Sequence, residues 1–309
     1  MQLIFEKLDE LKAKIDSADN VIDSYRIFHG RGKTFPELDF VTLDWFHPVI
    51  LVILFREPPD NWIIKFIDRI PSHLSTKVAC VVVQHRYVQG DPSDIVYGQL
   101  PEKTYAIRGP LRFHLHLAQQ QNTGFFLDIE PARQWLELQA KEKRILNLFS
   151  YTCSFSVVAL ASGAEKVVNV DMSGAALNLG RSNHQLNNLD KRRSQYLAEN
   201  ILKSWGRIKR AGPYDLVILD PPSFQKGSFD AGKDYAKLIR RLPELMPVGG
   251  LILSCLNNPD LNAQFLIDLF VEHCPMAQLK TRLPSHPDFP DAEPDRQLKM
   301  LVFSLIVEL

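Results

Sequence analysis

The sequence predicts a doubly wound, mostly parallel α/β sheet in its second half, preceded by a smaller α/β domain. Three observations lead to this prediction. From about residue 130 onward, short β-branched runs alternate with segments of helical length and periodicity. Residues 20–100 hold a different mixture, in which β-rich runs surround one helical segment. The chain has 309 residues, which is a usual length for two domains.

The first 120 residues are predicted to hold a helix and a small domain. Residues 1–18 place Leu and Ile at helical spacing, which indicates an amphipathic helix. Strand, strand, helix and strand are predicted in that order at residues 40–43, 49–55, 62–70 and 78–83. Residues 111–117 alternate apolar and polar side chains, as a half-buried strand does. The expected domains are an N-terminal helix, a small α/β substrate-recognition domain and a larger ligand-binding domain, over 1–20, 21–120 and 121–309.

The second half of the chain repeats strand and helix. The strand candidates are short and apolar, and they lie at 145–149, 166–170, 195–198, 214–219 and 250–254. The helical segments lie at 154–161, 174–189, 201–209, 235–246 and 261–272, and a last strand is expected at 299–307. Ligands of such sheets bind at the carboxyl ends of the strands, where the strand order reverses. The chemistry is therefore expected in the loops that follow the strands.

The composition excludes several classes of protein. Hydrophobic residues make up 45% of the chain and charged residues 23%, as in folded soluble domains. The longest apolar run, 48–55, is far shorter than the ~20 residues that span a bilayer, and residues 1–20 do not read as a signal peptide. The four cysteines form no closely spaced pair, which disfavours a zinc site or a disulfide framework. We expect a reduced cytoplasmic protein with no metal and no membrane association.

The charges are unevenly distributed, although 36 basic and 36 acidic residues give a formal net charge of zero. Residues 181–241 hold 13 basic and 6 acidic side chains, whereas residues 242–309 hold 4 and 9. Basic side chains that neutralise phosphates are typical of nucleic-acid binding, and the candidate RNA contacts here are Lys191, Arg192 and Arg193. Ordinary solvated helices would carry similar charges, so both interpretations stay open.

Polar residues follow four of the predicted strands. The loop after the first strand runs from Phe149 to Ser156. Asp171 follows the second strand, where a carboxylate can accept hydrogen bonds from two ribose hydroxyls. The pair Glu199–Asn200 follows the third strand and the run Asp220–Phe224 the fourth. One acid at a strand end is weak evidence, because such acids often cap helices. The ordered set of four is stronger evidence for a ligand site.

These segments resemble the class I S-adenosylmethionine-dependent methyltransferases, which have a Rossmann-like sheet. The motifs that carry the resemblance are Asn147–Thr152, Val170–Ser173 and Asp220–Phe224. More narrowly, the chain resembles bacterial enzymes that methylate large-subunit ribosomal RNA at cytosine carbon-5 or guanine nitrogen-7, and residues 121–128 with Arg133 match that group. The small domain, from Arg26 onward, also matches that group. The resemblance therefore covers roughly residues 21–309. It implies a methyltransferase for a base of ribosomal RNA, without the N-terminal PUA module of some relatives.

The resemblance also implies roles for individual residues. Asp171 would hold the ribose of the cofactor S-adenosylmethionine, Met172 would pack on its adenine, and Asn200 would accept a hydrogen bond from the adenine amino group. Phe224 would stack on the target base. The floor where methyl donor and base meet would be Asp220, Pro221 and Pro222. The complete expected cofactor set is Asn122, Phe126, Arg133, Phe149, Tyr151, Thr152, Ser154, Asp171, Met172, Asn200 and Asp220.

Two departures from the family pattern bear on binding and mechanism. The first loop has Cys153–Ser154 where the family has Gly-Gly, and because both residues are small, cofactor binding is expected to survive. Carbon-5 methylation needs a Cys thiolate, but the position of that cysteine in relatives is occupied here by Asn257. Cys255 lies two residues earlier, so we expect a core position for it, with a catalytic role as the alternative. We therefore predict transfer to a base nitrogen, with Asn257 at the base edge and no covalent intermediate.

Three other interpretations compete with this one. A nicotinamide-dependent dehydrogenase would carry G-x-G-x-x-G after the first strand, and residues 149–155 contain no glycine. A non-catalytic, RNA-binding relative could keep the fold alone; the Cys153–Ser154 loop favours it and the intact Asp220–Phe224 motif opposes it. A methyltransferase for a protein or a small molecule is compatible with the neutral net charge.

Overall fold

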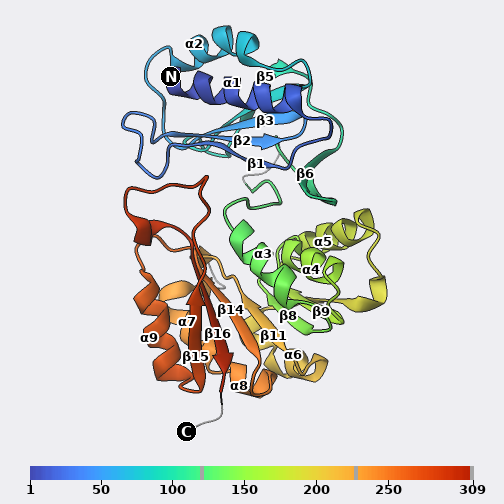
Figure 1. Ribbon diagram of the computed structural model, residues 1–309. Coiled ribbons are helices and arrows are strands. Elements are labelled where there is room, and N and C mark those ends of the chain that lie inside the picture. Colours follow the sequence, from blue (N-terminus) through green and yellow to red (C-terminus); the bar gives the residue numbers. More distant parts are fainter. Residues whose placement is uncertain (119–121, 226–228, 307–309) are drawn as a thin grey trace. The chain divides into compact units, whose positions relative to one another are not determined.

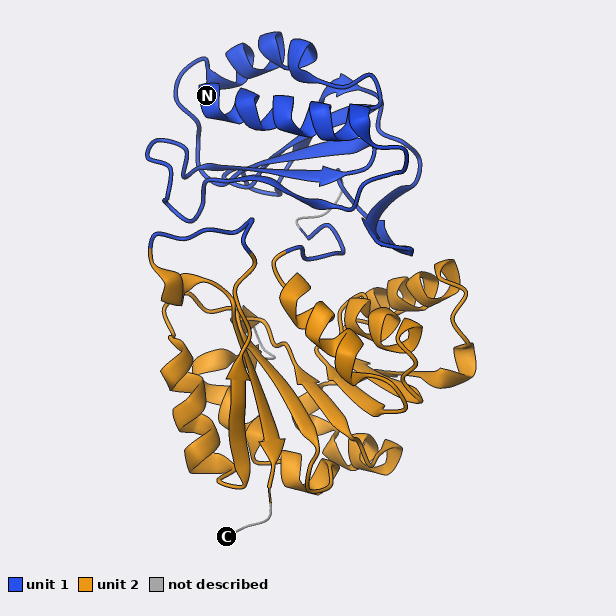
Figure 2. Cartoon of the chain, viewed as in Figure 1, with its two compact units in different colours: residues 1–127, 287–292 blue, residues 128–286, 293–309 orange. Residues whose placement is uncertain are grey.

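The computed structural model describes residues 1–118, 122–225 and 229–306 (Figure 1). It consists of two compact units (Figure 2). Unit 1 contains residues 1–127 and 287–292, and unit 2 contains residues 128–286 and 293–309. Among the described residues, no helix has the length and hydropathy needed to cross a bilayer.

Unit 1 is built on a five-stranded sheet in the order β1-β2-β3-β4-β5. The strands are β1 (Tyr25–His29), β2 (Val41–Phe46), β3 (Val49–Leu54), β4 (Cys80–His85) and β5 (Ser93–Gly98). Strands β3 and β4 pair in parallel and the other neighbours are antiparallel. Helices α1 (Gln2–Ser17) and α2 (Trp62–Arg69), followed by the 3-10 turn η1 (Ile70–His73), cover one face of the sheet (Figure 1). Strands β6 (Thr104–Arg108) and β7 (Leu111–Leu115) form a separate hairpin.

The predicted domain boundaries differ from those of the units at three places. Helix α1 is part of unit 1 because its apolar stripe, Ile4, Phe5, Leu8, Leu11 and Ile15, is buried in the core of that unit. The boundary expected at 120/121 lies at 127/128. Residues 287–292 also belong to unit 1, where the Ala292 N–H donates to the Gly32 carbonyl at 2.7 Å. All three boundaries depend on contacts between residues that are distant in sequence.

Unit 2 is a seven-stranded sheet in the order β10-β9-β8-β11-β14-β16-β15. The strands are β8 (Arg144–Leu148), β9 (Lys166–Asp171), β10 (Ser194–Ala198), β11 (Leu216–Leu219), β14 (Leu251–Leu256), β15 (Ala277–Arg282) and β16 (Lys299–Leu305). All neighbours from β10 to β14 are parallel, and β16 is antiparallel to both β14 and β15. The strand order reverses between β8 and β11, so the carboxyl ends of these strands are the expected ligand site.

Helices cover both faces of this sheet (Figure 1). Side chains of α3 (Glu130–Gln139) and α4 (Ser154–Ala161) pack against one face, with Ile145, Val167 and Ile218 of the strands. The other face packs against α6 (Trp205–Ala211), α7 (Ala231–Ile239), α8 (Leu242–Leu245) and α9 (Ala263–His273). The remaining elements are α5 (Gly174–Leu186), the short pair β12 (Phe224–Gln225) and β13 (Phe229–Asp230), and the 3-10 turns η2 (Lys191–Arg193), η3 (Ile201–Lys203) and η4 (Pro294–Arg296). The predicted doubly wound fold is confirmed.

Two predicted helices are wrong in detail. The helix expected at 201–209 is divided into η3 and α6 at Ser204, whose backbone is not helical. The helix expected at 235–246 begins earlier, because the Asp230 carboxylate caps it by accepting from the Gly232 N–H at 3.0 Å. It ends at Ile239, and α8 begins just before Pro243, which fits only the first turn of a helix. Strand β15 was not predicted, because this edge strand is almost entirely exposed and polar.

Candidate functional site

The loop between β8 and α4 is anchored by Asp171, the last residue of β9. One carboxylate oxygen of Asp171 accepts from the Tyr151 N–H at 2.9 Å, and the other accepts from the Ser173 N–H at 2.8 Å. Burial raises the pKa of Asp171, while these two N–H donors favour the charged form. Each oxygen retains acceptor capacity, so the carboxylate can also receive two hydroxyl groups.

The same loop adopts a strained backbone. Phe149, Tyr151 and Cys153 have φ values of +57°, +44° and +64°, in the left-handed region that non-glycine residues rarely adopt. The loop is held by the Ser150 N–H, which donates to the Val170 carbonyl at 3.1 Å. Positive φ values repeated within five residues are typical of loops that present their backbone to a ligand.

Helix α5 supports this loop from behind. The Asn183 side chain donates to the Thr152 carbonyl at 3.0 Å, and both residues are buried. Cys153 is fully buried, and a Cβ atom at Gly180 would lie 2.4 Å from its sulfur. Gly180 thus leaves the space into which the thiol fits. Burial raises the pKa of the Cys153 thiol to about 12, so it is a neutral packing group, as expected for a small buried residue.

A chain of buried hydrogen bonds connects the elements around the loop. The Asn147 amide donates to Asn169 at 3.0 Å, Asn169 donates to Ser156 at 3.1 Å, and the Ser156 hydroxyl lies 2.8 Å from His184 Nε2. His184 Nδ1 lies 2.7 Å from the Gly180 carbonyl. Burial lowers the pKa of His184, which keeps the ring neutral with its proton on Nδ1 and lets Nε2 accept from Ser156. The network fixes β8, β9, α4 and α5 relative to one another.

Asp220 follows β11 and interacts with two other charged residues. Burial raises the pKa of Asp220 to about 7, the Asp128 carboxylate adds to this rise, and the Arg133 guanidinium opposes it. Arg133 is fully buried on α3 and donates to the Ser154 hydroxyl at 3.3 Å, at the start of α4. Asp128 was not among the predicted site residues. The sequence offered one signal for Asp128: it is the last polar residue before α3, and it ends the segment 121–128 that resembles the methyltransferase family.

Side chains of α7 and of the loop after β11 form hydrogen bonds with β14 and with the residue that follows it. Tyr235 is buried on α7, and its hydroxyl lies 2.7 Å from Ser254 Oγ and donates to the Cys255 carbonyl at 2.8 Å. The Ser223 hydroxyl donates to the Asn257 carbonyl at 2.9 Å. Pro221 and Pro222 therefore lie between the end of β11 and the bonded Ser223, while Phe224 beyond them is 68% exposed and able to contact a ligand.

Cys255 lies inside β14 and not at its end. It is fully buried and pairs with Met300 of β16. Burial raises the pKa of its thiol well above the usual value, and the carboxylates of Asp220 and Asp128 raise it further. The thiolate that carbon-5 chemistry requires is therefore disfavoured. Asn257 lies just beyond the strand end and is exposed.

The residues predicted to contact adenine follow β9 and β10. Met172 is 47% exposed beside Asp171, and the Glu199 N–H donates to the Asp171 carbonyl at 3.0 Å, which joins the two loops. The Asn200 side-chain oxygen already accepts from the Leu202 N–H at 3.0 Å. Because an amide oxygen has two lone pairs, the predicted contact with an adenine amino group is still available.

Two of the predicted cofactor residues belong to unit 1. Asn122 is exposed and Phe126 is 45% exposed, while the other predicted cofactor residues belong to unit 2. Gln121, which stands in the segment used for the resemblance, lies outside the described residues. A contribution of Asn122 and Phe126 to cofactor binding stays a prediction.

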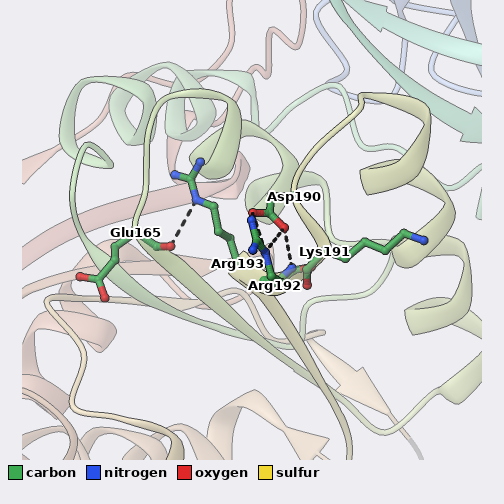
Figure 3. A network of polar contacts seen from close by, with 6 residues as sticks. Glu165, Asp190, Lys191, Arg192 and Arg193 are labelled. Carbon is green, nitrogen blue, oxygen red and sulfur yellow. Dashed lines mark hydrogen bonds and ion pairs between the residues drawn. The ribbon is translucent and has the colours of Figure 1, made fainter.

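The basic run Lys191–Arg193 lies at the opposite edge of the sheet from these loops. It forms η2, which precedes β10. The Arg193 guanidinium donates to the carbonyl of Glu165, just before β9 (Figure 3), and to that of Ala164. Arg192 forms an ion pair with Asp190 at 2.9 Å. Within the described part of the chain, only the Lys191 ammonium of the three makes no hydrogen bond or ion pair, and it extends away from the network (Figure 3). The RNA contact stays a prediction, and of its three residues Lys191 and Arg192 are exposed.

The chain is similar to several known proteins. A profile of the family described as S-adenosylmethionine-dependent methyltransferase matches residues 25–304. Ribosomal RNA large subunit methyltransferase I of Aeromonas hydrophila is 31% identical over 180 residues, which are 56% of this chain and 45% of that protein. Ribosomal RNA large subunit methyltransferase K/L of Pseudoalteromonas translucida is 38% identical over 149 residues, which are 46% of this chain and 21% of that protein.

The matched regions span less than half the length of these two relatives. A solved structure of a Streptococcus mutans protein assigned to the S-adenosylmethionine-dependent methyltransferases superposes with a TM-score of 0.83. The alignment covers 98% of this chain and 81% of that protein, at 24% identity. This similarity shows that the two proteins share their fold over 98% of this chain.

Proposed function

Because the chain belongs to the S-adenosylmethionine-dependent methyltransferase family, we propose that it transfers a methyl group from S-adenosylmethionine to a base of ribosomal RNA. The observation that carries the proposal is the arrangement at the carboxyl ends of β8, β9 and β11. There the strained 149–153 loop, the anchored Asp171 and the Asp220–Phe224 segment follow neighbouring strands of one sheet, on both sides of the point where the strand order reverses.

The residues after β8 and β9 have the donors and acceptors that the cofactor needs. Asp171 would accept from both ribose hydroxyls with the acceptor positions that Tyr151 and Ser173 leave open. The backbone of the 149–153 loop would hold the methionine part, and the exposed Met172 would cover the adenine. When bound, S-adenosylmethionine supplies an electrophilic methyl group.

The loop after β11 would hold the target base. An ionised Asp220 can accept a hydrogen bond from a base amino group, and its pKa of about 7 means that this form prevails above neutral pH. Phe224 is exposed enough to stack on a base that has left its helix. Alignment of a nitrogen lone pair with the methyl carbon is then the main requirement, and it needs no enzyme nucleophile.

Transfer to nitrogen is favoured over transfer to carbon-5. The Cys255 thiol is buried and its pKa is raised by its surroundings, and Cys153 is equally buried in the first loop. A carbon-5 mechanism would require one of these groups to add to the ring as a thiolate. Asn257, exposed at the end of β14, would instead hydrogen-bond the base edge.

The printed names of the matched relatives support ribosomal RNA as the substrate, and a cytoplasmic site of action would follow from it. The test is mass spectrometry of nucleosides from ribosomal RNA of cells with and without the gene. One methylated nucleoside should be lost in the deletion strain and should return when the purified protein and S-adenosylmethionine are added to that RNA. Identical nucleoside profiles, with methyl transfer to protein or a metabolite instead, would refute the RNA substrate. No S-adenosylhomocysteine binding at all would favour a non-catalytic relative.

A further inference from the structure

Lys299 is a buried lysine that the proposed chemistry does not use. It is the first residue of β16, it is fully buried, and it pairs with Leu256 of β14. The residues after it on β16, beginning with Met300 and Leu301, are buried and apolar. Burying an ammonium is unfavourable unless its N–H groups find acceptors, so its presence on this strand calls for a specific role.

The Lys299 ammonium binds two backbone carbonyls. It donates to the Asn258 carbonyl at 2.6 Å and to the Asp295 carbonyl at 3.1 Å. Asn258 belongs to the loop that follows β14, and Asp295 belongs to the turn η4 that precedes β16. A single side chain therefore holds together two chain segments at the carboxyl edge of the sheet.

The Asn257 carbonyl, next to that of Asn258 in the same loop, is bound by a residue of the candidate site. The Asn257 carbonyl accepts from the Ser223 hydroxyl at 2.9 Å, and Ser223 follows Pro222 in the Asp220–Phe224 segment. Two consecutive carbonyls, those of Asn257 and Asn258, are thus each bound by a side chain from a different element. With both bonds in place, the backbone that carries the exposed Asn257 side chain is held next to the segment that would hold the base.

We propose that Lys299 is a positioning residue, which fixes the Asn257–Asn258 segment for methyl transfer without contacting substrate or cofactor. This inference rests on the proposed function, because the base would lie beside Asn257.

The charges around Lys299 agree with a role other than stabilising the fold. Burial lowers the pKa of Lys299 to about 8, and the nearby Arg282 and Arg296 lower it while Asp295 and Asp260 raise it. The folded state therefore disfavours this ammonium relative to the unfolded chain. A Met side chain of similar length would avoid that burial cost but would leave the two carbonyls without this donor, so the two hydrogen bonds are what the lysine adds at this position.

The test compares Lys299→Met with the control Lys280→Met, which changes an exposed lysine of the adjacent strand β15. Both are assayed with ribosomal RNA from the deletion strain. Lys299→Met should lower kcat at least tenfold, while its Kd for S-adenosylhomocysteine changes less than twofold. Lys280→Met should match the wild type. An unchanged kcat, or a lower melting temperature together with loss of S-adenosylhomocysteine binding, would overturn the proposal.

Hydrogen exchange tests the same inference without an RNA substrate. The N–H groups of Asp260 and Leu261 donate to Asn258, to its side-chain oxygen at 2.9 Å and to its carbonyl at 3.4 Å. Both should exchange faster in Lys299→Met, while β14 amides keep their rates. Unchanged exchange at these two amides would refute the positioning role. A wild-type protein inactive on ribosomal RNA would contradict the proposed function instead, and the exchange result would still decide whether Lys299 holds the loop.

Discussion

The packing of Cys153 against Gly180 makes a quantitative prediction about the cofactor loop. In Gly180→Ala the new methyl group would lie 2.4 Å from the Cys153 sulfur and 3.0 Å from its Cβ atom. Both residues are in a closed part of the structure, because Cys153 is fully buried. Overpacking of this kind costs about 1–3 kcal/mol, and replacing a helical glycine by alanine recovers roughly 1 kcal/mol. Gly180→Ala should therefore destabilise the protein by up to about 2 kcal/mol.

The second substitution, Cys153→Gly, removes the clash and suits the left-handed backbone at φ +64°. In that background Gly180→Ala meets no sulfur, so only the gain in helix propensity remains, and the double variant should be more stable than Cys153→Gly by about 0.5–1 kcal/mol. The sign of the Gly180→Ala effect should thus reverse between the two backgrounds, with an interaction free energy of roughly 1–3 kcal/mol, which is the cost of the overpacking alone.

Urea unfolding of the four proteins measures these free energies, and calorimetry with S-adenosylhomocysteine measures binding. Gly180→Ala should also weaken binding, because the displaced Cys153 shifts the backbone that Asp171 and Asn183 hold. Cys153→Gly should restore it. The same loss of stability from Gly180→Ala in both backgrounds would show that the thiol and the glycine do not share one space, and the reasoning would fail.

Four further outcomes are expected. Asp171→Ala should lose most affinity for S-adenosylhomocysteine in calorimetry, since the ribose acceptor is gone; unchanged affinity would refute the cofactor assignment. The pKa of Asp220 is raised to about 7 in the folded state, so the stability it contributes is present below its unfolded pKa of about 4 and is lost as pH rises through 7. Asp220→Asn should therefore be the more stable protein at pH 8, by on the order of 2–4 kcal/mol in urea unfolding, with no difference near pH 3. Cys255→Ser should retain methyl transfer to ribosomal RNA; complete loss in a folded variant, or an RNA adduct on Cys255, would establish carbon-5 chemistry. Lys191→Glu with Arg192→Glu should weaken RNA binding and its salt dependence if phosphates reach the amino edge of the sheet, and wild-type affinity would assign both to an ordinary solvated surface.

Local patterns in the sequence were sufficient for most of unit 2. Residues that face one side of the sheet alternate with residues that face the other, as at Ile145 and Leu146, and this periodicity is readable without tertiary contacts. Helix α4 was predicted with its observed bounds, Ser154–Ala161. The exposed edge strand β15 and the division of the 201–209 helix were not readable, because neither depends on an apolar pattern.

Charge counting had a different limit. The RNA contact of Lys191, Arg192 and Arg193 was predicted from composition. Composition does not tell at which edge of the sheet these side chains lie. Their place before β10 puts them at the amino edge of the sheet, and Arg193 is engaged with backbone carbonyls. An arginine that binds carbonyls of its own chain has fewer donors left for phosphate.

The sequence by itself determined the succession of strands and helices, and with it the edge at which Asp171 and Asp220 lie, because the carboxyl ends of parallel strands share one edge. Only the tertiary structure decided which side chains support those residues. The contact of Cys153 with Gly180, the interaction of Asp128 with Asp220, and the bond from Lys299 to Asn258 each join residues far apart in the chain. Hydrophobic periodicity specifies which face of an element is buried, but not which neighbour it meets; that depends on packing of the whole unit.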